Sequence, residues 1–202
     1  MHTGFAQVKS KLVDKLSGMK LLALGLPLLL AGCITSPSAP AKPNELDAAG
    51  RTAFLEAINL KRDAAKNISC AGGSGLGYAD PEPHANPSPR VIWNAKLEAA
   101  ALNNASFLAA KQANITTGDP HNGAGNGSVS SRVLSANYQF ATAGETIASG
   151  QANASIVAQN WQDSTNGHCN LMLDPVMKDV GGALVTSASG TKYWVMVIGK
   201  LQ

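Results

Sequence analysis

The sequence predicts an α+β fold, a three-layer α-β-α sandwich with a central antiparallel sheet. The clearest observation is a C-terminal hairpin in which residues 180–186 and 192–198 are strand-like and residues 187–190 form a turn. Along its second strand two apolar sets alternate: Tyr193, Val195 and Val197 point one way, and Trp194, Met196 and Ile198 point the other. A strand that is apolar on both faces must be covered on both sides. Amphipathic segments upstream supply the covering helices.

The first of these helices is expected between Asn44 and Lys66. Asn44 is a good N-cap, with Asp47 at the third helical position. The segment places Leu55, Ile58 and Ala65 on one face and charged residues elsewhere, which is typical of an amphipathic helix.

Two further helices follow a long loop. Residues 67–90 are rich in Gly and Pro and predict that loop, and residues 91–93 form a short extended piece. An Ala-rich helix comes next, with Leu97, Ala101 and Leu108 at helical spacing. Residues 116–131 are again rich in Gly, Asn and Ser and predict a second loop, and residues 155–161 predict a short helix.

The N-terminus has the features of a bacterial lipoprotein signal over residues 1–32. Four lysines precede an apolar run, residues 21–30, that is too short to cross a bilayer. The run ends in Leu-Ala-Gly before Cys33, which we expect to carry the lipid. Ile34 rather than Asp follows it, which favours an outer-membrane address. The alternative is an ordinary signal peptide that contains a cysteine.

Three segments follow from this assignment: the signal at 1–32, a lipidated Cys33 with a flexible tether to residue 43, and a domain from 44 to 202. The tether is composed mainly of Ser, Pro and Ala, which cannot build a core. Met19 begins a complete short signal by itself, so the sequence leaves open whether translation starts at Met1 or Met19.

Charge argues against nucleic acid as a partner. Of the sixteen Lys and Arg residues, four lie in the signal, as does one of the thirteen Asp and Glu residues. The processed chain therefore has twelve of each and no formal net charge. No basic stripe remains to hold a polyanion.

Cys70 and Cys169 remain after Cys33 is assigned to the lipid. In an oxidising compartment two thiols most simply form a disulfide, although two buried free thiols or a metal thiolate would also satisfy the composition.

The familiar catalytic strings, such as G-x-S-x-G, H-E-x-x-H and the P-loop, do not occur. What remains is a sparse set of titratable groups in polar, Gly-flanked segments: His121, Glu145 and His168. Two imidazoles with a carboxylate or water satisfy four-coordinate Zn²⁺. The alternative is that these histidines are exposed or cap helices. His84 lies in a Pro-rich loop and is expected in solvent.

Taken in order, a series of short strings resembles the CAP superfamily, which comprises cysteine-rich secretory proteins, antigen 5 and pathogenesis-related proteins and has a bacterial SCP-like branch. The similarity runs over about residues 50 to 199. Its strings are Ile58-Asn59-x-x-Arg62, Val91-Ile92-Trp93-Asn94-x-x-Leu97, His121-Asn122-Gly123 with Arg132 and Tyr138, Gly144-Glu145-Thr146-Ile147-Ala148-x-Gly150, Trp161-x-x-Ser164, Gly167-His168-Cys169-Asn170-Leu171-Met172, Val180-Gly181-Gly182-Ala183 and Tyr193-Trp194.

The resemblance implies an α-β-α sandwich with a central cavity lined by His121, Glu145 and His168. It also implies that Cys70 pairs with Cys169, because bacterial relatives often pair the corresponding cysteines. The chain departs from the family twice. Thr146 replaces the usual Asn, and Ser164 replaces a second cavity Glu found in many animal members, which leaves Asp163 as the nearest carboxylate.

Two functions from different classes follow. The first is a non-enzymatic binding module whose cavity holds a divalent metal, with Zn²⁺ bound weakly by His121 and His168, and a lipid, sterol-like molecule, peptide or envelope partner. The second is a zinc-dependent, peptidase-like hydrolase in which Glu145 acts as general base. Catalytic zinc usually has three protein ligands, and the sequence supplies two, which favours the binding module.

Overall fold

The computed structural model describes residues 43–70, 87–122 and 126–202. The signal, Cys33, the tether up to residue 42 and His84 lie outside these residues. Residues 39–202 group into one compact unit. Among the described helices, none combines the length and apolar character needed to cross a bilayer.

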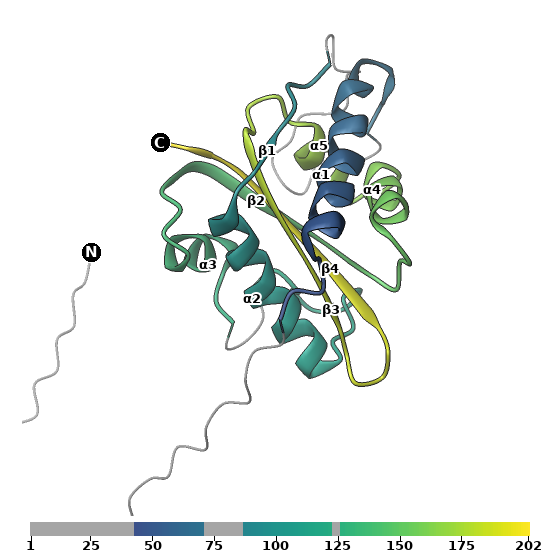
Figure 1. The fold of residues 1–202 in the computed structure, drawn as a ribbon, viewed down its shortest axis with the longest axis vertical. Coiled ribbons are helices and arrows are strands. Elements are labelled where there is room, and N and C mark those ends of the chain that lie inside the picture. The colour runs from purple at the N-terminus through teal and green to yellow at the C-terminus, as the bar shows by residue number, and fades with distance from the viewer. Residues whose placement is uncertain (1–42, 71–86, 123–125) are drawn as a thin grey trace, which may run out of the picture. The chain divides into compact units, whose positions relative to one another are not determined.

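The helices precede the final hairpin, and the other two described strands lie among them in the chain (Figure 1). In chain order the described elements are α1 (Ala48–Asp63), η1 (Ala65–Asn67), β1 (Ile92–Trp93), α2 (Ala95–Lys111), α3 (Val129–Ser135), β2 (Phe140–Ser149), α4 (Ala154–Gln162), α5 (His168–Leu173), β3 (Asp179–Thr186) and β4 (Lys192–Leu201).

The described strands form one sheet in the order β1-β3-β4-β2. β3 and β4 make the expected hairpin, and β2 pairs antiparallel with the other side of β4. The two-residue β1 runs parallel to β3, so the sheet is mixed rather than purely antiparallel. The predicted α+β sandwich is confirmed, with this addition at one edge.

Two hydrophobic cores lie on opposite faces of the sheet, as the alternation along β4 predicts. Trp194, Met196 and Ile198 join a core with residues of α1, α4 and α5. Tyr193, Val195 and Val197 join the second core, which α2 and α3 help to build. Each layer of helices therefore buries one face of the strands, and the three layers are held together through β4.

Close packing of the helices on β3 depends on two glycines. A Cβ on Gly181 would lie 2.0 Å from the backbone nitrogen of Glu98 in α2, and one on Gly182 would lie 2.6 Å from the ring of Phe54 in α1. Neither contact is tolerable, so the absence of a side chain lets both helix layers approach the same strand.

The start of α1 differs from the prediction. Asp47, not Asn44, is the N-cap, and its Oδ1 accepts from the Gly50 amide at 2.7 Å. Asn44 instead joins the N-terminal segment to the sheet, because its side chain accepts from the Leu184 amide at 3.1 Å and donates to the Gly182 carbonyl at 3.0 Å. Tertiary pairing with β3 has overridden a good local capping signal.

Arg62 fixes the end of α1. It is fully buried, and its guanidinium donates to the carbonyl oxygens of Pro89, Met172, Asp174 and Met177. Burial lowers the pKa of Arg62 to about 10, with Asp174 opposing the shift.

Three expectations, that Glu145, His168 and residues 116–131 lie in loops, need correction. Glu145 lies within strand β2 rather than in a loop, and His168 is the first residue of helix α5. The segment 116–131, expected as a loop, contains the start of α3 at Val129.

Candidate functional site

A cavity of about 450 Å³ brings together the three residues singled out in the sequence, His121, Glu145 and His168. They come from three separate parts of the chain: the loop before α3, the middle of β2 and the start of α5. The apolar part of the lining includes Ile115, Ile147 and Leu171. A second hollow of about 320 Å³ shares His121, Glu145 and Leu171 with it.

Glu145 lies at the buried side of the cavity, and its carboxylate is fully engaged. Its side chain is 0% exposed. Oε1 accepts from Asn104 Nδ2 at 2.9 Å, from Arg132 at 3.0 Å and from His121 Nδ1 at 3.0 Å, while Oε2 accepts from Arg132 at 2.9 Å. Arg132 and Glu145 therefore form a buried ion pair in which the guanidinium contacts both carboxylate oxygens.

Arg132 organises the polar side of the site. Its side chain is 3% exposed and projects from α3. Besides Glu145, it donates to the carbonyl oxygens of Gly127 at 2.6 Å and of His121 at 3.1 Å. The same guanidinium thus fixes the carboxylate and the backbone of the cavity histidine.

His121 is also held from its own loop. The amides of His121 and Asn122 donate to Asp119 Oδ1 at 3.0 and 3.2 Å, and Asn122 Nδ2 donates to Asp119 Oδ2 at 2.7 Å. Since the Glu145 carboxylate can only accept, the His121 Nδ1 carries the proton of their shared bond. Its other ring nitrogen, Nε2, has no hydrogen-bond partner among the described residues.

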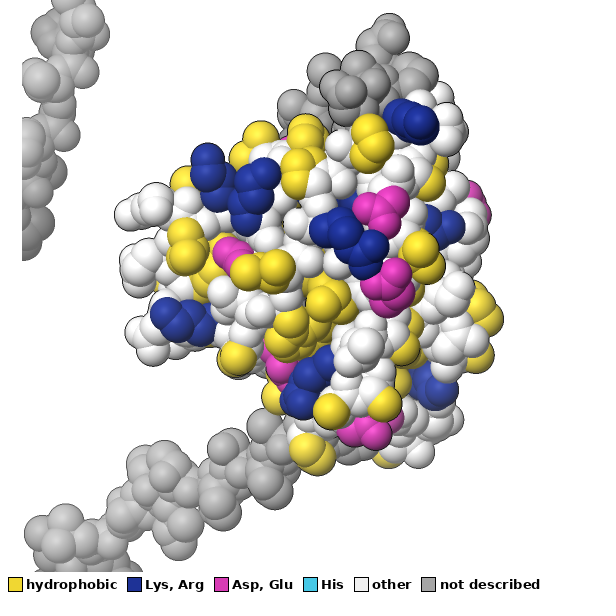
Figure 2. Space-filling model, turned by 45° about the horizontal axis from the view of Figure 1, so that its top comes forward, with side chains coloured by type: hydrophobic (Ala, Val, Ile, Leu, Met, Phe, Trp, Pro, Cys, Tyr) yellow, Lys and Arg dark blue, Asp and Glu magenta, His cyan; other side chains and the backbone are white. Residues whose placement is uncertain are grey.

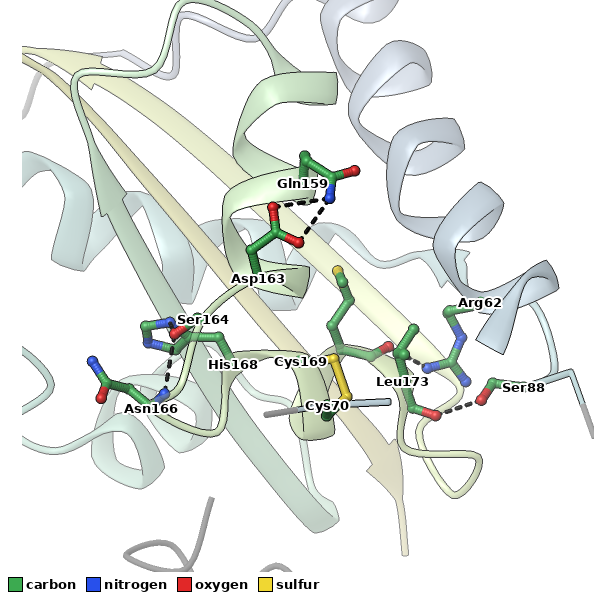
Figure 3. The surroundings of a disulfide bond; sticks show 11 residues. Arg62, Cys70, Ser88, Gln159, Asp163, Ser164, Asn166, His168, Cys169 and Leu173 are labelled. Atoms are coloured by element: carbon green, nitrogen blue, oxygen red, sulfur yellow. Dashed lines mark hydrogen bonds between the residues drawn. A yellow bond between two sulfur atoms is a disulfide. The ribbon is translucent and has the colours of Figure 1, made fainter. Parts of the chain in front are cut away.

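His168 begins α5, where Gly167 adopts a left-handed conformation with φ of 79°. Its Nδ1 lies 3.0 Å from Ser164 Oγ (Figure 3). Burial lowers the pKa of His168 to about 4, and the neighbouring His121 adds a smaller repulsive contribution. The imidazole is therefore neutral at physiological pH.

A disulfide between Cys70 and Cys169 anchors α5 next to His168, with Cα atoms 5.4 Å apart (Figure 3). The predicted pairing is confirmed. Both cysteines are buried, and the bond spans 99 positions of the sequence. It ties the six-residue helix that carries His168 to the segment after α1.

Asp163 is not part of the cavity lining. It is exposed at the end of α4, and both its oxygens accept from Gln159 Nε2, at 2.9 and 3.0 Å (Figure 3). Ser164, the next residue, takes the position beside His168. The departure from the family noted at Ser164 therefore leaves the cavity without a second carboxylate from α4.

Two residues that bind Glu145 have roles that were not predicted from the sequence. Asn104 lies on a predicted helix, where a buried amide looks like any other polar residue, and Arg132 appeared only as part of a matching string. The helical spacing of Asn104 could have indicated its burial. It lies one turn from Ala101 and from Leu108, on the face of the helix expected to be buried.

The cavity offers two nitrogen donors of the type that zinc prefers, but not a complete set of protein ligands. Within the described residues no group of three or more His, Cys, Asp or Glu side chains is placed to hold a metal. Each cavity imidazole has an orienting partner at Nδ1 and none at Nε2 among those same residues. Two imidazoles with oriented rings match the nitrogen ligands zinc prefers, with solvent or ligand completing the coordination.

Comparison with solved structures gives relatives of the same fold. An extracellular protein with an SCP domain from Bacillus anthracis is 16% identical, with a TM-score of 0.57 over 81% of this chain. This chain corresponds to 45% of that longer protein. An outer surface protein from Borrelia burgdorferi is 15% identical, with a TM-score of 0.52 over 74% of this chain and 90% of its own.

At the sequence level, curated proteins give no significant match. The family model for CAP, the cysteine-rich secretory protein family, matches residues 55–198. These residues include α2 to α5, strands β1 to β3, most of β4 and all three cavity residues. The chain belongs to the CAP family of cysteine-rich secretory proteins.

Proposed function

We propose that this CAP domain is a non-catalytic binding module of the bacterial cell envelope. Its cavity binds a divalent metal, zinc by preference, through His121 and His168, together with a small ligand that packs on the apolar wall. Residues 1–32 direct export, and a lipid on Cys33 anchors the domain to the outer membrane.

The observation that carries this proposal is the engagement of Glu145. Its carboxylate accepts hydrogen bonds from Asn104, Arg132 and His121 and has no exposed surface. Both oxygens of this carboxylate are bound by Arg132, and Oε1 also accepts from Asn104 and His121, so the group is positioned by its partners rather than turned toward solvent. Glu145 therefore orients His121 in the manner of a carboxylate–histidine pair behind a metal.

The alternative function, a hydrolase with Glu145 as general base, requires a carboxylate that can reach a water molecule and take its proton. The same three donors oppose that role. The Nε2 atom of each cavity histidine has no hydrogen-bond partner among the described residues. It can therefore supply a lone pair or a proton to a ligand. These features support binding rather than proton abstraction.

Localisation rests on the lipoprotein features of the sequence. The similar proteins from Bacillus anthracis and Borrelia burgdorferi are described as an extracellular and an outer surface protein, which agrees with export. On the face that Figure 2 presents, basic and acidic side chains are interspersed and no basic stripe is visible, which favours a partner other than nucleic acid.

Zinc titration by calorimetry on protein purified without a chelating tag tests the metal site. We expect one zinc ion per chain, and loss of that binding in His168→Ala with an unchanged circular dichroism spectrum. His84→Ala is the matched control and should bind as the parent does. Equal zinc binding by the parent and His168→Ala would refute the site, and turnover of a model peptide that depends on Glu145 would favour the hydrolase.

A further inference from the structure

The cavity lies along the free edge of strand β2. Among the described strands the order is β1-β3-β4-β2, so β2 has a partner strand on one side only. The cavity lining comes from both helix layers, because Ile115 packs against the core on the α2 side and Leu171 belongs to the core on the α1 side. Glu145 and Ile147 of β2 are in the same lining. A hollow bounded by both layers and by an edge strand lies next to that edge, between the layers.

The backbone of β2 has a defined direction along this edge. In an antiparallel strand, successive residues direct their N–H and C=O groups alternately toward the partner strand and away from it. The register with β4 is continuous from Thr142 to Ser149. Just after it, the Gly150 amide donates to the Lys192 carbonyl of β4 at 2.8 Å, so the even-numbered residues face β4. The odd-numbered residues therefore direct their backbone groups toward the free edge.

These outward backbone groups are largely unpaired. The N–H groups of Ala143, Glu145 and Ile147 have no hydrogen-bond partner among the described residues. The same is true of the carbonyl oxygens of Ala143 and Glu145 within that part of the chain. The Ile147 carbonyl is occupied, because it accepts from the indole of Trp161 at 3.3 Å. An extended chain presents donors and acceptors at the same spacing, about 6.8 Å for every second residue.

We propose that this edge of β2 binds an extended peptide segment, which adds to the sheet as a further strand inside the cavity. The inference rests on the proposed binding function and deepens it by naming the ligand class. Main-chain hydrogen bonds to the odd-numbered residues of β2 would hold the peptide. Its side chains would point alternately toward the two helix layers, one row toward Ile115 and the other toward Leu171.

The shape and charge of the cavity suit such a segment. The cavity of about 450 Å³ and the second hollow of about 320 Å³ adjoin at Glu145, and together they follow β2 from Gly144 to Ile147. That stretch of strand is about 10 Å long, which is room for three or four residues of an added strand. A peptide backbone carries no net charge, and the Glu145 carboxylate is already paired with Arg132. Because the pairing uses the backbone of β2, the imidazoles remain available to a metal.

Amide hydrogen exchange, followed by NMR in the zinc-free protein, tests the pairing residue by residue. In the free protein the odd-numbered amides from 143 to 147 should exchange about tenfold faster than the even-numbered amides from 144 to 148, which bond to β4. A capped pentapeptide of alternating Thr and Val, at millimolar concentration, should slow the odd-numbered set about tenfold and leave the even-numbered set unchanged. The same peptide with N-methylated internal amides should protect neither set. Odd-numbered amides that are already protected in the free protein, or that the peptide leaves unprotected, would overturn the inference.

Two proline variants test the position of the added strand. Ala143→Pro removes an outward N–H next to the second hollow without removing a bond to β4, and should weaken peptide binding about fivefold. Ser149→Pro also removes an outward N–H, but it lies on the far side of the carbonyl that Trp161 occupies and should bind as the parent does. Equal binding by the two variants would overturn the placement along β2.

Zinc titration separates this inference from the proposed metal site. Zinc binding without protection of the odd-numbered amides would refute the peptide pairing alone. Protection of those amides without zinc binding would refute the metal site alone, because the exchange is recorded without metal.

Discussion

The buried pair of Glu145 and Arg132 gives a prediction with a magnitude. Their side chains are 0% and 3% exposed. In Glu145→Gln the Arg132 charge would remain among the carbonyl oxygens of Gly127 and His121, without another ion-pair partner in the described part of the chain. Breaking a buried pair by removing one partner costs about 3–5 kcal/mol, so we expect a loss of roughly that size in the free energy of unfolding.

Arg132→Met should cost a similar amount, because it leaves the Glu145 carboxylate buried and unpaired. The double variant should cost about as much as either single change rather than their sum, since it removes both charges together. Urea unfolding followed by the fluorescence of the buried Trp161 and Trp194 measures all three. Domains of this size have about 5–15 kcal/mol of stability, so the variants remain measurable.

Arg90 provides the matched control. It pairs with Glu56 and Asp63, but its side chain is 48% exposed, so Arg90→Met should cost at most about 1 kcal/mol. If Glu145→Gln destabilised the domain no more than Arg90→Met, the Glu145 carboxylate would not be held by its ion pair. Glu145 would then no longer be disfavoured as a general base.

Three further predictions concern the anchor, the disulfide and His168. Cys33→Ser should leave an uncleaved precursor or release the domain from the membrane fraction, and normal cleavage with retention in membranes would refute lipidation. Cys169→Ser should lower the free energy of unfolding by about 2–5 kcal/mol, whereas an unchanged urea midpoint would contradict a structural role for the disulfide. Because the pKa of His168 falls from 6.5 to about 4 on folding, the unfolded chain binds the proton more readily and stability is lost as pH falls between these values. In His168→Gln we expect about 1–2 kcal/mol of this acid-induced loss of stability to disappear, after allowance for the partial exposure of the ring. The free energy of unfolding should then depend less on pH than in the parent. A pH profile parallel to the parent's would refute this role of His168.

The elements that could be predicted are those whose pattern is visible in a short window of sequence. The β3–β4 hairpin was clear because apolar residues alternate along β4 while both faces are buried. Strand β2 was missed because its residues include Gly144, Glu145 and several small side chains, which show little β-propensity. Its conformation comes from pairing with β4 over nearly its whole length, and that pairing is not visible in a short window of sequence.

In the site, too, some residues could be predicted from the sequence and others are set by tertiary structure. The cavity residues were found through family strings, because 46 positions separate His121 from His168 and no local pattern joins them. Their partners were not found. Asn104 binds Glu145 from 41 positions away, and the buried position of Arg132 depends on helix α3, which the sequence did not predict. Hydrogen-bond partners in a buried network are set by tertiary structure, and residue type alone does not identify them.

Strand register links the fold to the chemistry of the cavity. Glu145 pairs with Val197 on β4, and both side chains lie on the face of the sheet that α2 covers. A slip of one residue between β2 and β4 would turn Glu145 toward the other core and place Thr146 in the cavity. Arg132 and Asn104 would then have no carboxylate to bind, and the buried Arg132 charge would lose its ion-pair partner. The ion pair thus disfavours the wrong register, and the correct register in turn places the carboxylate that orients His121. Stability and site geometry therefore depend on the same contact, which explains how a charged network is retained inside a small domain.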